Sequence, residues 1–337
     1  MNRRSFLRGA AMLGASAAGL GALSACDVRP ANSGARSVKV ARVGVLAGGA
    51  IQSHNNDAFY QGMRGLGWVE RQNVTFEVRA SEGDTTKLPS LVAELLGLPV
   101  DVIVTGNLPA AQAAQRATRT TPIVLAGVAE PVSVGLVGSL AYPGGNVTGL
   151  ARLPAQLAAK RLEILKEMLP GLVRVAALWD LSAGAGLQLD ETQAAAPGLG
   201  LQIQVLTAKS LRDFEAAVAA ASRGRAEAVT LHGPLFGAPV TSTRILADLA
   251  VRARLPSMAI EKQYVESGVL VAYGENVTEI FRRAAIYVDK ILRGVNPAGL
   301  PIEQSTDFEL VINSTTAQAL GLTIPPSVSS RVSAWTR

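Results

Sequence analysis

The sequence predicts an α/β protein with two doubly wound lobes, each built on a parallel sheet. First, valine-rich runs alternate with segments of helical spacing from residue 40 to residue 106, which is typical of parallel strands joined by right-handed crossovers. Second, a similar alternation returns from residue 156 to residue 259. Third, 48% of the 337 residues are hydrophobic but only 4% are aromatic. Such a core of Ala, Val and Leu suits helices packed on a parallel sheet.

Four strands and three helices are expected from residue 40 to residue 126, which extends the first alternation by one helix and one strand. Phe59, Met63 and Leu66 fall at i, i+4 and i+7, which places them on one face of a helix. The strands are expected at 40–47, 74–78, 102–105 and 122–126, and the helices at 59–66, 88–95 and 108–118. A further helix is expected to begin at Glu130-Pro131-Val132.

The second alternation leads into a long helix at 277–292. Asn276 is its expected N-cap, with Glu279 three residues further on in the spacing of a capping box. Strands are expected at 173–179, 201–206, 226–231, 255–259, 268–273 and 308–312, and helices at 156–169, 187–196, 211–221, 241–253 and 315–320.

Three extended links, at 147–150, 268–273 and 300–306, are expected to carry the chain between the lobes. They give a first lobe of residues 38–149 plus 273–304, and a second lobe of residues 150–272 plus 305–330. Ligands bind beyond the carboxyl ends of parallel strands. The loops that follow the strands are therefore the first places to expect a binding site.

Residues 1–26 are expected to be an export signal. Arg3 and Arg4, followed by Phe6-Leu7, match a twin-arginine motif, and the apolar run at 10–23 is too short for a good membrane span. The run ends in Leu23-Ser24-Ala25-Cys26, which resembles the lipobox of bacterial lipoproteins and predicts lipidation of Cys26. The alternative is a plain cleaved signal with an incidental cysteine. Residues 27–37, rich in small and polar residues, are expected to be a flexible tether.

The charge pattern argues against nucleic-acid binding. The formal net charge is +6, and loss of Arg3, Arg4 and Arg8 with the signal would lower it by three, to +3. No basic run interleaved with aromatic residues follows, as a nucleic-acid surface would require. Cys26 is the only cysteine, so the sequence predicts neither a disulfide within the chain nor a cysteine metal site.

Six groups of residues, spread over the chain in a fixed order, resemble the tryptophan/tyrosine-type substrate-binding lipoproteins of ABC importers. They are Phe59-Tyr60-Gln61-Gly62-Met63-Arg64 with Leu66-Gly67-Trp68-Val69-Glu70, Asn73-Val74, Pro143-Gly144-Gly145-Asn146-Val147-Thr148-Gly149, Lys160-Arg161-Leu162-Glu163, Leu292-Arg293-Gly294, and Phe308-Glu309-Leu310-Val311-Ile312-Asn313 with Ala319-Leu320-Gly321-Leu322. The resemblance implies a periplasmic-binding-protein type I-like fold, with a three-segment hinge that lets two lobes close on a small ligand. It also implies an ABC permease as partner, and an aromatic amino acid or related small organic acid as ligand.

Three loops depart from the family pattern. Glu130-Pro131 stands where family members commonly have Asp-Pro, and Asp180-Leu181-Ser182 stands where Asn-Pro or a similar pair is frequent. His232-Gly233-Pro234-Leu235-Phe236 replaces an acidic or aromatic pair. All three are expected to face the ligand, so they bear on which ligand is bound.

The candidate ligand-binding residues follow from the expected carboxyl ends of the strands. A small buried ligand needs a few convergent polar groups and an apolar wall. The candidates are Ser53, His54, Asn55, Thr105, Gly106, Asn107 and Glu130 in the first lobe, and Asp180, Ser182, His232, Phe236, Glu261, Tyr264 and Tyr273 in the second. No metal and no cofactor are expected, and the protein is expected to be a monomer on the periplasmic or cell-surface side of a membrane.

Enzymatic motifs are missing from the sequence. It has no GxSxG elbow, no phosphate-binding P-loop and no HExxH, and its two histidines, His54 and His232, are expected in opposite lobes. The prediction is a binding protein that makes and breaks no bond. Two alternatives remain open: a ligand-sensing module of a membrane receptor, and a periplasmic hydrolase using His54 or His232 with Asp180.

Overall fold

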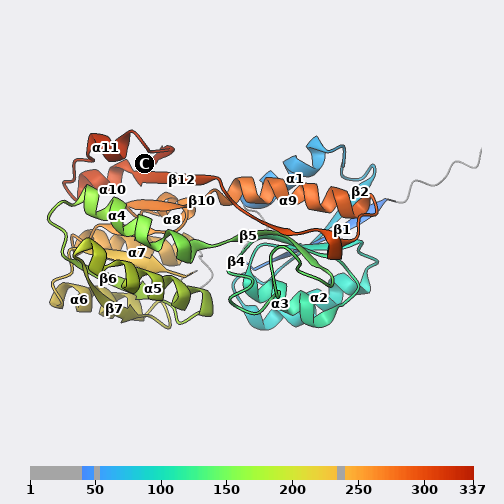
Figure 1. Cartoon of the computed structure of the whole chain (residues 1–337), viewed down its shortest axis with the longest axis horizontal. Helices are drawn as coiled ribbons and strands as arrows, with labels where there is room; N and C mark the ends of the chain where they lie inside the picture. Colours follow the sequence, from blue (N-terminus) through green and yellow to red (C-terminus); the bar gives the residue numbers. More distant parts are fainter. Residues whose placement is uncertain (1–39, 49–53, 234–239) are drawn as a thin grey trace, which may run out of the picture. The chain divides into compact units, whose positions relative to one another are not determined.

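The computed structural model describes residues 40–48, 54–233 and 240–337, and residues 39–337 form one compact unit. The described chain contains two sheets, each covered by helices on both faces (Figure 1). The predicted α/β fold class is confirmed. Among the described residues, no helix combines the length and apolar character needed to cross a membrane.

The first sheet has six strands, all parallel, in the order β11-β5-β4-β3-β1-β2. The strands are β1 (Ala41–Ala47), β2 (Val74–Ala80), β3 (Val102–Thr105), β4 (Ile123–Ala129), β5 (Val147–Arg152) and β11 (Ile302–Gln304). One face is covered by α1 (His54–Gly65) and α9 (Val277–Leu292), the other by α2 (Leu88–Gly97) and α3 (Leu108–Ala117). Phe59 and Met63 pack with Ile280 and Val288 on the first face, as their spacing predicts.

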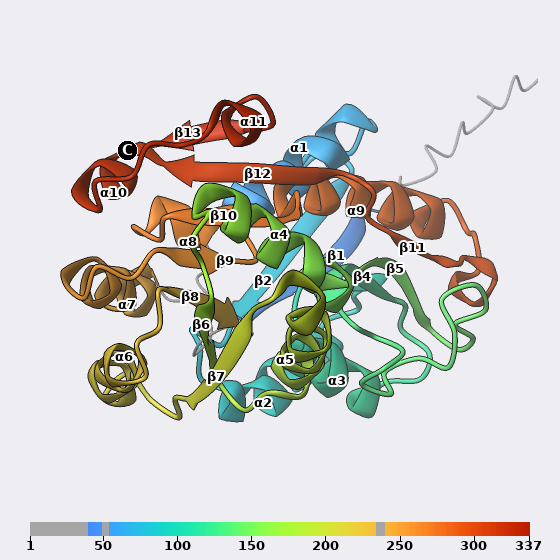
Figure 2. The ribbon, with the colours of Figure 1, turned by 60° about the vertical axis from the view of Figure 1, so that its left-hand side comes forward.

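The second sheet has seven strands in the order β13-β12-β10-β9-β8-β6-β7, and β12 runs antiparallel to β10. Figure 2 shows β12 and β13 at one edge and β7 at the other. The strands are β6 (Arg174–Trp179), β7 (Gln202–Thr207), β8 (Ala228–His232), β9 (Ser257–Ala259), β10 (Val271–Glu275), β12 (Phe308–Asn313) and β13 (Ala334–Thr336). The helices are α4 (Ala158–Met168), α5 (Ala183–Ala195), α6 (Asp213–Arg223), α7 (Val240–Arg252), α8 (Lys262–Glu266), α10 (Ser314–Ala319) and α11 (Pro326–Ser329).

The chain passes between the sheets three times, after β5, after β10 and after β11. The sequence placed lobe boundaries at residues 149 and 273. In the structure β5 stays in the first sheet to Arg152, which pairs with Ala129 of β4. Strand β10 stays in the second sheet to Glu275, which pairs with Phe308 of β12. Both extensions depend on partner strands, which local sequence does not reveal.

Polar side chains fix the starts of two helices near these strand ends. The Asn276 side chain accepts from Glu279 N at 3.1 Å, which caps α9 as predicted, while the Glu279 carboxylate pairs with Arg282. Asn107 caps α3 by accepting from Ala110 N at 3.0 Å. Such caps stabilise a helix by about 1 kcal/mol.

The prediction of a helix that begins at Glu130 is wrong, because the chain forms only a turn there. Glu130 adopts a left-handed φ of 51° and Gly135 a φ of 72°. Between them, Val134 N donates to Glu130 O at 3.0 Å and Leu136 N to Pro131 O at 2.9 Å. A left-handed residue ends a helix, so the segment closes after a single turn. The short elements α8, α11 and β13 were not predicted.

Candidate functional site

The structure places most of the predicted site residues where strands end. Thr105 and His232 are the last residues of β3 and β8, Asp180 follows β6, and Glu130 follows β4. Glu261 immediately precedes α8. Ser53, Phe236, Cys26, Arg3, Arg4 and the side chain of His54 lie outside the described residues.

Four strand-end residues carry a buried polar atom that has no hydrogen-bond partner among the described residues. They are Thr105 Oγ1 of β3, Trp179 Nε1 of β6, His232 Nδ1 of β8 and Glu275 Oε2 of β10. Buried polar groups are nearly always paired, so these atoms are available to a bound molecule. The remaining such atoms belong to Gln188, Gln204 and Thr336. Thr336 ends β13, whose carboxyl end lies at the opposite edge because β12 is antiparallel to β10.

His232 is held neutral inside the second lobe. It is 2% exposed, and its Nε2 lies 2.9 Å from Thr230 Oγ1. Burial lowers the pKa of His232 to about 3, and the positive charge of Arg161 acts in the same direction. Trp179 lies opposite His232 in the register of β6 and β8. Side chains in register on parallel neighbours share a face, so the indole and the imidazole are neighbours.

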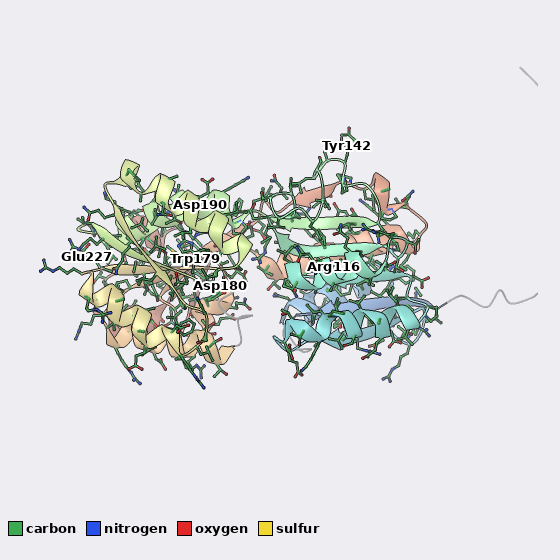
Figure 3. The ribbon with its side chains drawn as sticks, turned by 90° about the horizontal axis from the view of Figure 1, so that it is seen from below. Arg116, Tyr142, Trp179, Asp180, Asp190 and Glu227 are labelled. Carbon is green, nitrogen blue, oxygen red and sulfur yellow. The ribbon has the colours of Figure 1, made fainter. Side chains whose placement is uncertain are left out.

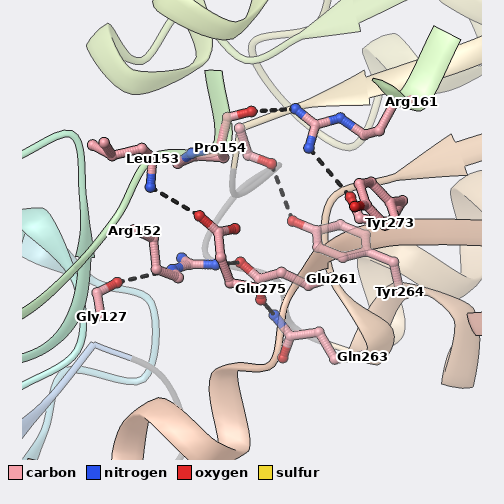
Figure 4. Close-up of polar contacts among 11 residues, drawn as sticks. Gly127, Arg152, Leu153, Pro154, Arg161, Glu261, Gln263, Tyr264, Tyr273 and Glu275 are labelled. Atoms are coloured by element: carbon pink, nitrogen blue, oxygen red, sulfur yellow. Dashed lines mark hydrogen bonds and ion pairs between the residues drawn. The ribbon is translucent and has the colours of Figure 1, made fainter. Parts of the chain in front are cut away.

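An ion pair joins the two lobes at the first crossing (Figure 4). Arg152, the last residue of β5, pairs with Glu261, and both side chains are nearly buried, at 12% and 11% exposure. Arg152 Nε also donates to Gly127 O at 2.8 Å, while Gln263 Nε2 donates to Glu261 Oε2 at 2.8 Å. Burial disfavours the charged guanidinium, but the charges of Glu261 and Glu275 outweigh it and raise the pKa of Arg152.

Glu275 and Arg161 form the rest of this crossing. Leu153 N donates to Glu275 Oε1 at 2.9 Å, and Glu275 is 3% exposed. Arg161 of α4 is also buried and donates to the backbone oxygens of Tyr273 and Pro154. Burial lowers the pKa of Arg161 to about 10, with Glu275 acting in the opposite direction.

Glu130 approaches the same crossing from the first lobe. It is 5% exposed, and its Oε1 accepts from Ala155 N at 3.1 Å. Burial raises the pKa of Glu130; the bond from Ala155 lowers it, and the charge of Glu275 raises it further. The acidic side chains after β4 and at the end of β10 therefore influence each other electrostatically although they come from different sheets.

Several predicted residues have positioning roles in the structure. Tyr264 is buried and its hydroxyl donates to Gly233 O at 3.1 Å, which ties α8 to the end of β8. Asp180 Oδ1 accepts from Ser182 Oγ at 2.6 Å in the turn after β6. Asn107 caps the start of α3, and Asn55 Oδ1 accepts from Thr278 Oγ1 at 3.1 Å. The Tyr273 ring stacks on Phe308. Gly106 packs so closely that a Cβ there would lie 2.4 Å from Phe281 Cζ.

The hydrolase alternative finds no support in these contacts. The hydrogen-bond partner of His232 is Thr230, whereas Asp180 accepts a hydrogen bond from Ser182. No hydrogen bond joins His232 to Asp180 in the described part of the chain. Likewise, the described residues contain no group of three or more His, Cys, Asp or Glu side chains placed to hold a metal ion.

Trp179, Arg152, Arg161 and Glu275 were not among the predicted site residues. Trp179 ends a strand that was predicted to end there, so the rule that selected His232 would also have found it. Figure 3 shows Trp179 beside Asp180, which was selected. Arg152 and Glu275 lie two residues beyond the predicted ends of β5 and β10. Arg161 lies inside a helix, in the Lys160-Arg161-Leu162-Glu163 group that carries the family resemblance, but the group alone does not indicate that its guanidinium is buried.

Two surface hollows of the described chain lie elsewhere. A hollow of about 520 Å³ between α2 and α3 is lined by Pro89, Pro109 and Arg116, the last labelled in Figure 3. A second, of about 370 Å³, adjoins Trp68 and Asp101 near the amino end of β1. Neither contains a strand-end residue of the site. Because ligands of parallel sheets bind at the carboxyl ends, the strand ends remain the candidate site.

Comparisons with known proteins agree with this architecture. A family model described as "ABC transporter substrate binding protein" matches residues 39–335. A tyrosine-binding protein of Clostridioides difficile is 24% identical over 78% of this chain and 75% of its own length. A conserved domain protein from Vibrio cholerae has a TM-score of 0.79 and 28% identity, covering 88% of this chain and all of its own. A Streptococcus pneumonia ABC domain in complex with L-Trp also has a TM-score of 0.79, with 24% identity over 88% of this chain and 99% of its own.

Proposed function

Because the chain belongs to the ABC transporter substrate-binding protein family, we propose that it captures an aromatic amino acid between its lobes and delivers it to an ABC permease. The tyrosine-binding relative and the L-Trp complex support this ligand class. Trp179 and its neighbour His232 offer an aromatic wall and a polar edge in the second lobe. No bond is made or broken in this function.

One observation carries the proposal: unpaired buried polar atoms lie at strand ends of both sheets. A ligand that bonds Thr105 in the first lobe and Trp179, His232 or Glu275 in the second would stabilise the closed arrangement of the lobes relative to the open one. Ligand binding then shifts the population between two states of one protein. The permease would recognise the ligand-bound state.

The export and anchoring predictions belong to the same proposal. Arg3 and Arg4 would direct the chain to the twin-arginine route, and Cys26 would carry the lipid. About ten residues of flexible tether would hold the binding unit roughly 20 Å from the bilayer. A Cys26→Ala variant should then appear in the soluble fraction, while wild-type protein stays with membranes.

A ligand screen tests the binding function directly. The chain without its export segment (residues 36–337) contains the compact unit 39–337. It is mixed with amino acids, aromatic acids, sugars and nucleosides, and its thermal unfolding is followed. A ligand present at 100 times its Kd adds about 2.7 kcal/mol to the free energy of unfolding. If no compound of a broad panel stabilises well-folded protein, the proposed function is wrong.

A further inference from the structure

The strands of the first sheet begin at the end of the first lobe that lies away from the crossings. All six strands are parallel, and the chain leaves for the second sheet from the carboxyl ends of β5 and β11 (Figure 1). At the opposite end, Val40 is the residue through which the amino-terminal segment joins β1. A tether that enters here holds the first lobe by the amino ends of its strands.

Three segments at this end of the lobe are bonded to one another. Ala41 N of β1 donates to the backbone oxygen of Asn73, in the loop before β2, at 2.9 Å. Trp68 Nε1 of the same loop donates to Asp289 Oδ1 at 2.9 Å, and Arg293 Nε donates to that oxygen at 2.7 Å. The segments, which we call the amino-end face, are residues 40–41, 66–73 and 289–297.

The amino-end face carries apolar surface around a hollow. Val40 is 45% exposed and Val295 is 43% exposed. Trp68, Val295 and Pro297 line the hollow of about 370 Å³ described above. The Trp68 ring is only partly buried, and its N–H group is already paired with Asp289. Indole rings and aliphatic side chains of this kind suit the boundary between lipid headgroups and acyl chains.

The rim of the amino-end face is basic. Arg64, in the last turn of α1, and Arg71 are exposed, and neither has an ion-pair partner in the described part of the chain. Arg293 is 62% exposed although it pairs with Asp289. Cations at helix ends, such as Arg64 and Arg293, also complement the helix dipole. Arg71 lies in a loop, where that explanation does not apply, and anionic lipid attracts such a charge.

We propose that the amino-end face rests on the lipid headgroups of the membrane to which the chain is anchored, with Trp68 and Val295 at the boundary and Arg71 on the phosphates. This contact rests on the proposed anchoring at Cys26. Thirteen residues lie between Cys26 and Val40, and they span at most about 45 Å. A tethered contact needs little affinity of its own, because the tether raises the effective concentration. The second lobe is then the lobe farther from the bilayer.

Coupling through Cys26 tests the contact without depending on lipidation in the cell. Cys26 is the only cysteine, so the chain from Cys26 onward, which contains the compact unit 39–337, can be joined to a maleimide lipid. The vesicles contain phosphatidylethanolamine, phosphatidylglycerol and a lipid with a spin-labelled headgroup, which quenches nearby indoles. We expect quenching in wild-type protein and in Trp335→Phe, and loss of most of it in Trp68→Phe. Trp335 is the control because it is 50% exposed in the second lobe.

Two results would overturn the membrane contact. Quenching that survives in Trp68→Phe would show that another face meets the lipid or that no face is preferred. Wild-type protein without quenching would show that the face stays clear of lipid, as it should if the hollow receives another protein. Both failures leave the proposed function intact, because ligand binding is measured on the same protein in solution, without vesicles.

A matched pair of variants isolates the charge of Arg71. Arg71 and Arg254 are both exposed and both left-handed, with φ values of 65° and 54°, but Arg254 precedes β9 of the second sheet. Arg71→Gln should lower the ratio of contacting to free protein about fivefold on these vesicles, measured as lost quenching of Trp68. Arg254→Gln should leave that ratio unchanged. Equal effects of the two variants would contradict the placement of Arg71 on the headgroups.

Discussion

Among the residues chosen from the sequence, His232 is almost completely buried. Burial and Arg161 lower its pKa to about 3 from an ordinary value of 6.5. Between these pH values the unfolded chain binds a proton that the folded chain does not. The contribution of His232 to the free energy of unfolding should therefore be complete above pH 6.5. As the pH falls from 6.5 towards 3, this contribution should decrease by up to about 1.4 kcal/mol per pH unit.

The measurement is urea unfolding between pH 7 and pH 4 for wild-type protein and His232→Gln. Gln can keep the contact with Thr230 but cannot become charged in the unfolded chain. The variant should lose less stability than wild type across this range, whatever its stability at pH 7. Equal slopes for the two proteins would show that His232 titrates in the folded state as it does in water.

Arg152 and Glu261 differ from the surface ion pairs of this chain because both side chains are almost buried. Arg152→Ala leaves a buried carboxylate without its partner, which typically costs about 3–5 kcal/mol. The matched control is Arg79→Ala in the exposed pair with Glu94, where the loss should stay below about 1 kcal/mol. Denaturant unfolding compares the two variants, and a similar cost for both would contradict the burial argument.

The helix α9 is the element that sequence predicted best, and its bounds of Val277–Leu292 match the prediction. Asn276 should contribute about 1 kcal/mol through its bond to Glu279 N. Asn276→Ala should lower the free energy of unfolding by about that amount. Asn276→Asp retains an acceptor oxygen and should lose only a small part of this stability. If Asn276→Ala and Asn276→Asp lose the same amount of stability, capping is not the cause.

Elements were predictable where local pattern decides them. Valine-rich runs predicted the central strands, and the polar cap Asn276 predicted the start of α9. The ends of β5 and β10 were not predictable, because Arg152 and Glu275 are extended only through pairing with β4 and β12. The helix expected at Glu130 failed because its left-handed φ is imposed by the turn. Because the predicted strands ended too early, Arg152 and Glu275 were missed as residues of the candidate site, while His232 and Glu130 were found.

The core of the first lobe depends on a helix that comes late in the chain, after most of the second lobe. Ile280, Ala284 and Val288 of α9 complete the core around Phe59 and Met63, yet α9 follows every central strand of the second sheet. Residues 39–153 alone should therefore expose the apolar face of α1 and fail to fold. Joining residues 276–305 to this fragment through a flexible linker should restore cooperative unfolding, measured by circular dichroism. A fragment 39–153 that folds by itself would contradict this account of the core.

The late position of α9 also has a consequence for synthesis. About 210 residues separate the end of α1 from the start of α9. At 5–20 residues per second, α1 is made roughly 10–40 s before the helix that covers it. During that interval Phe59 and Met63 have no native cover from α9 on the ribosome. The nascent chain therefore offers a chaperone an apolar helix face long before either lobe can be finished.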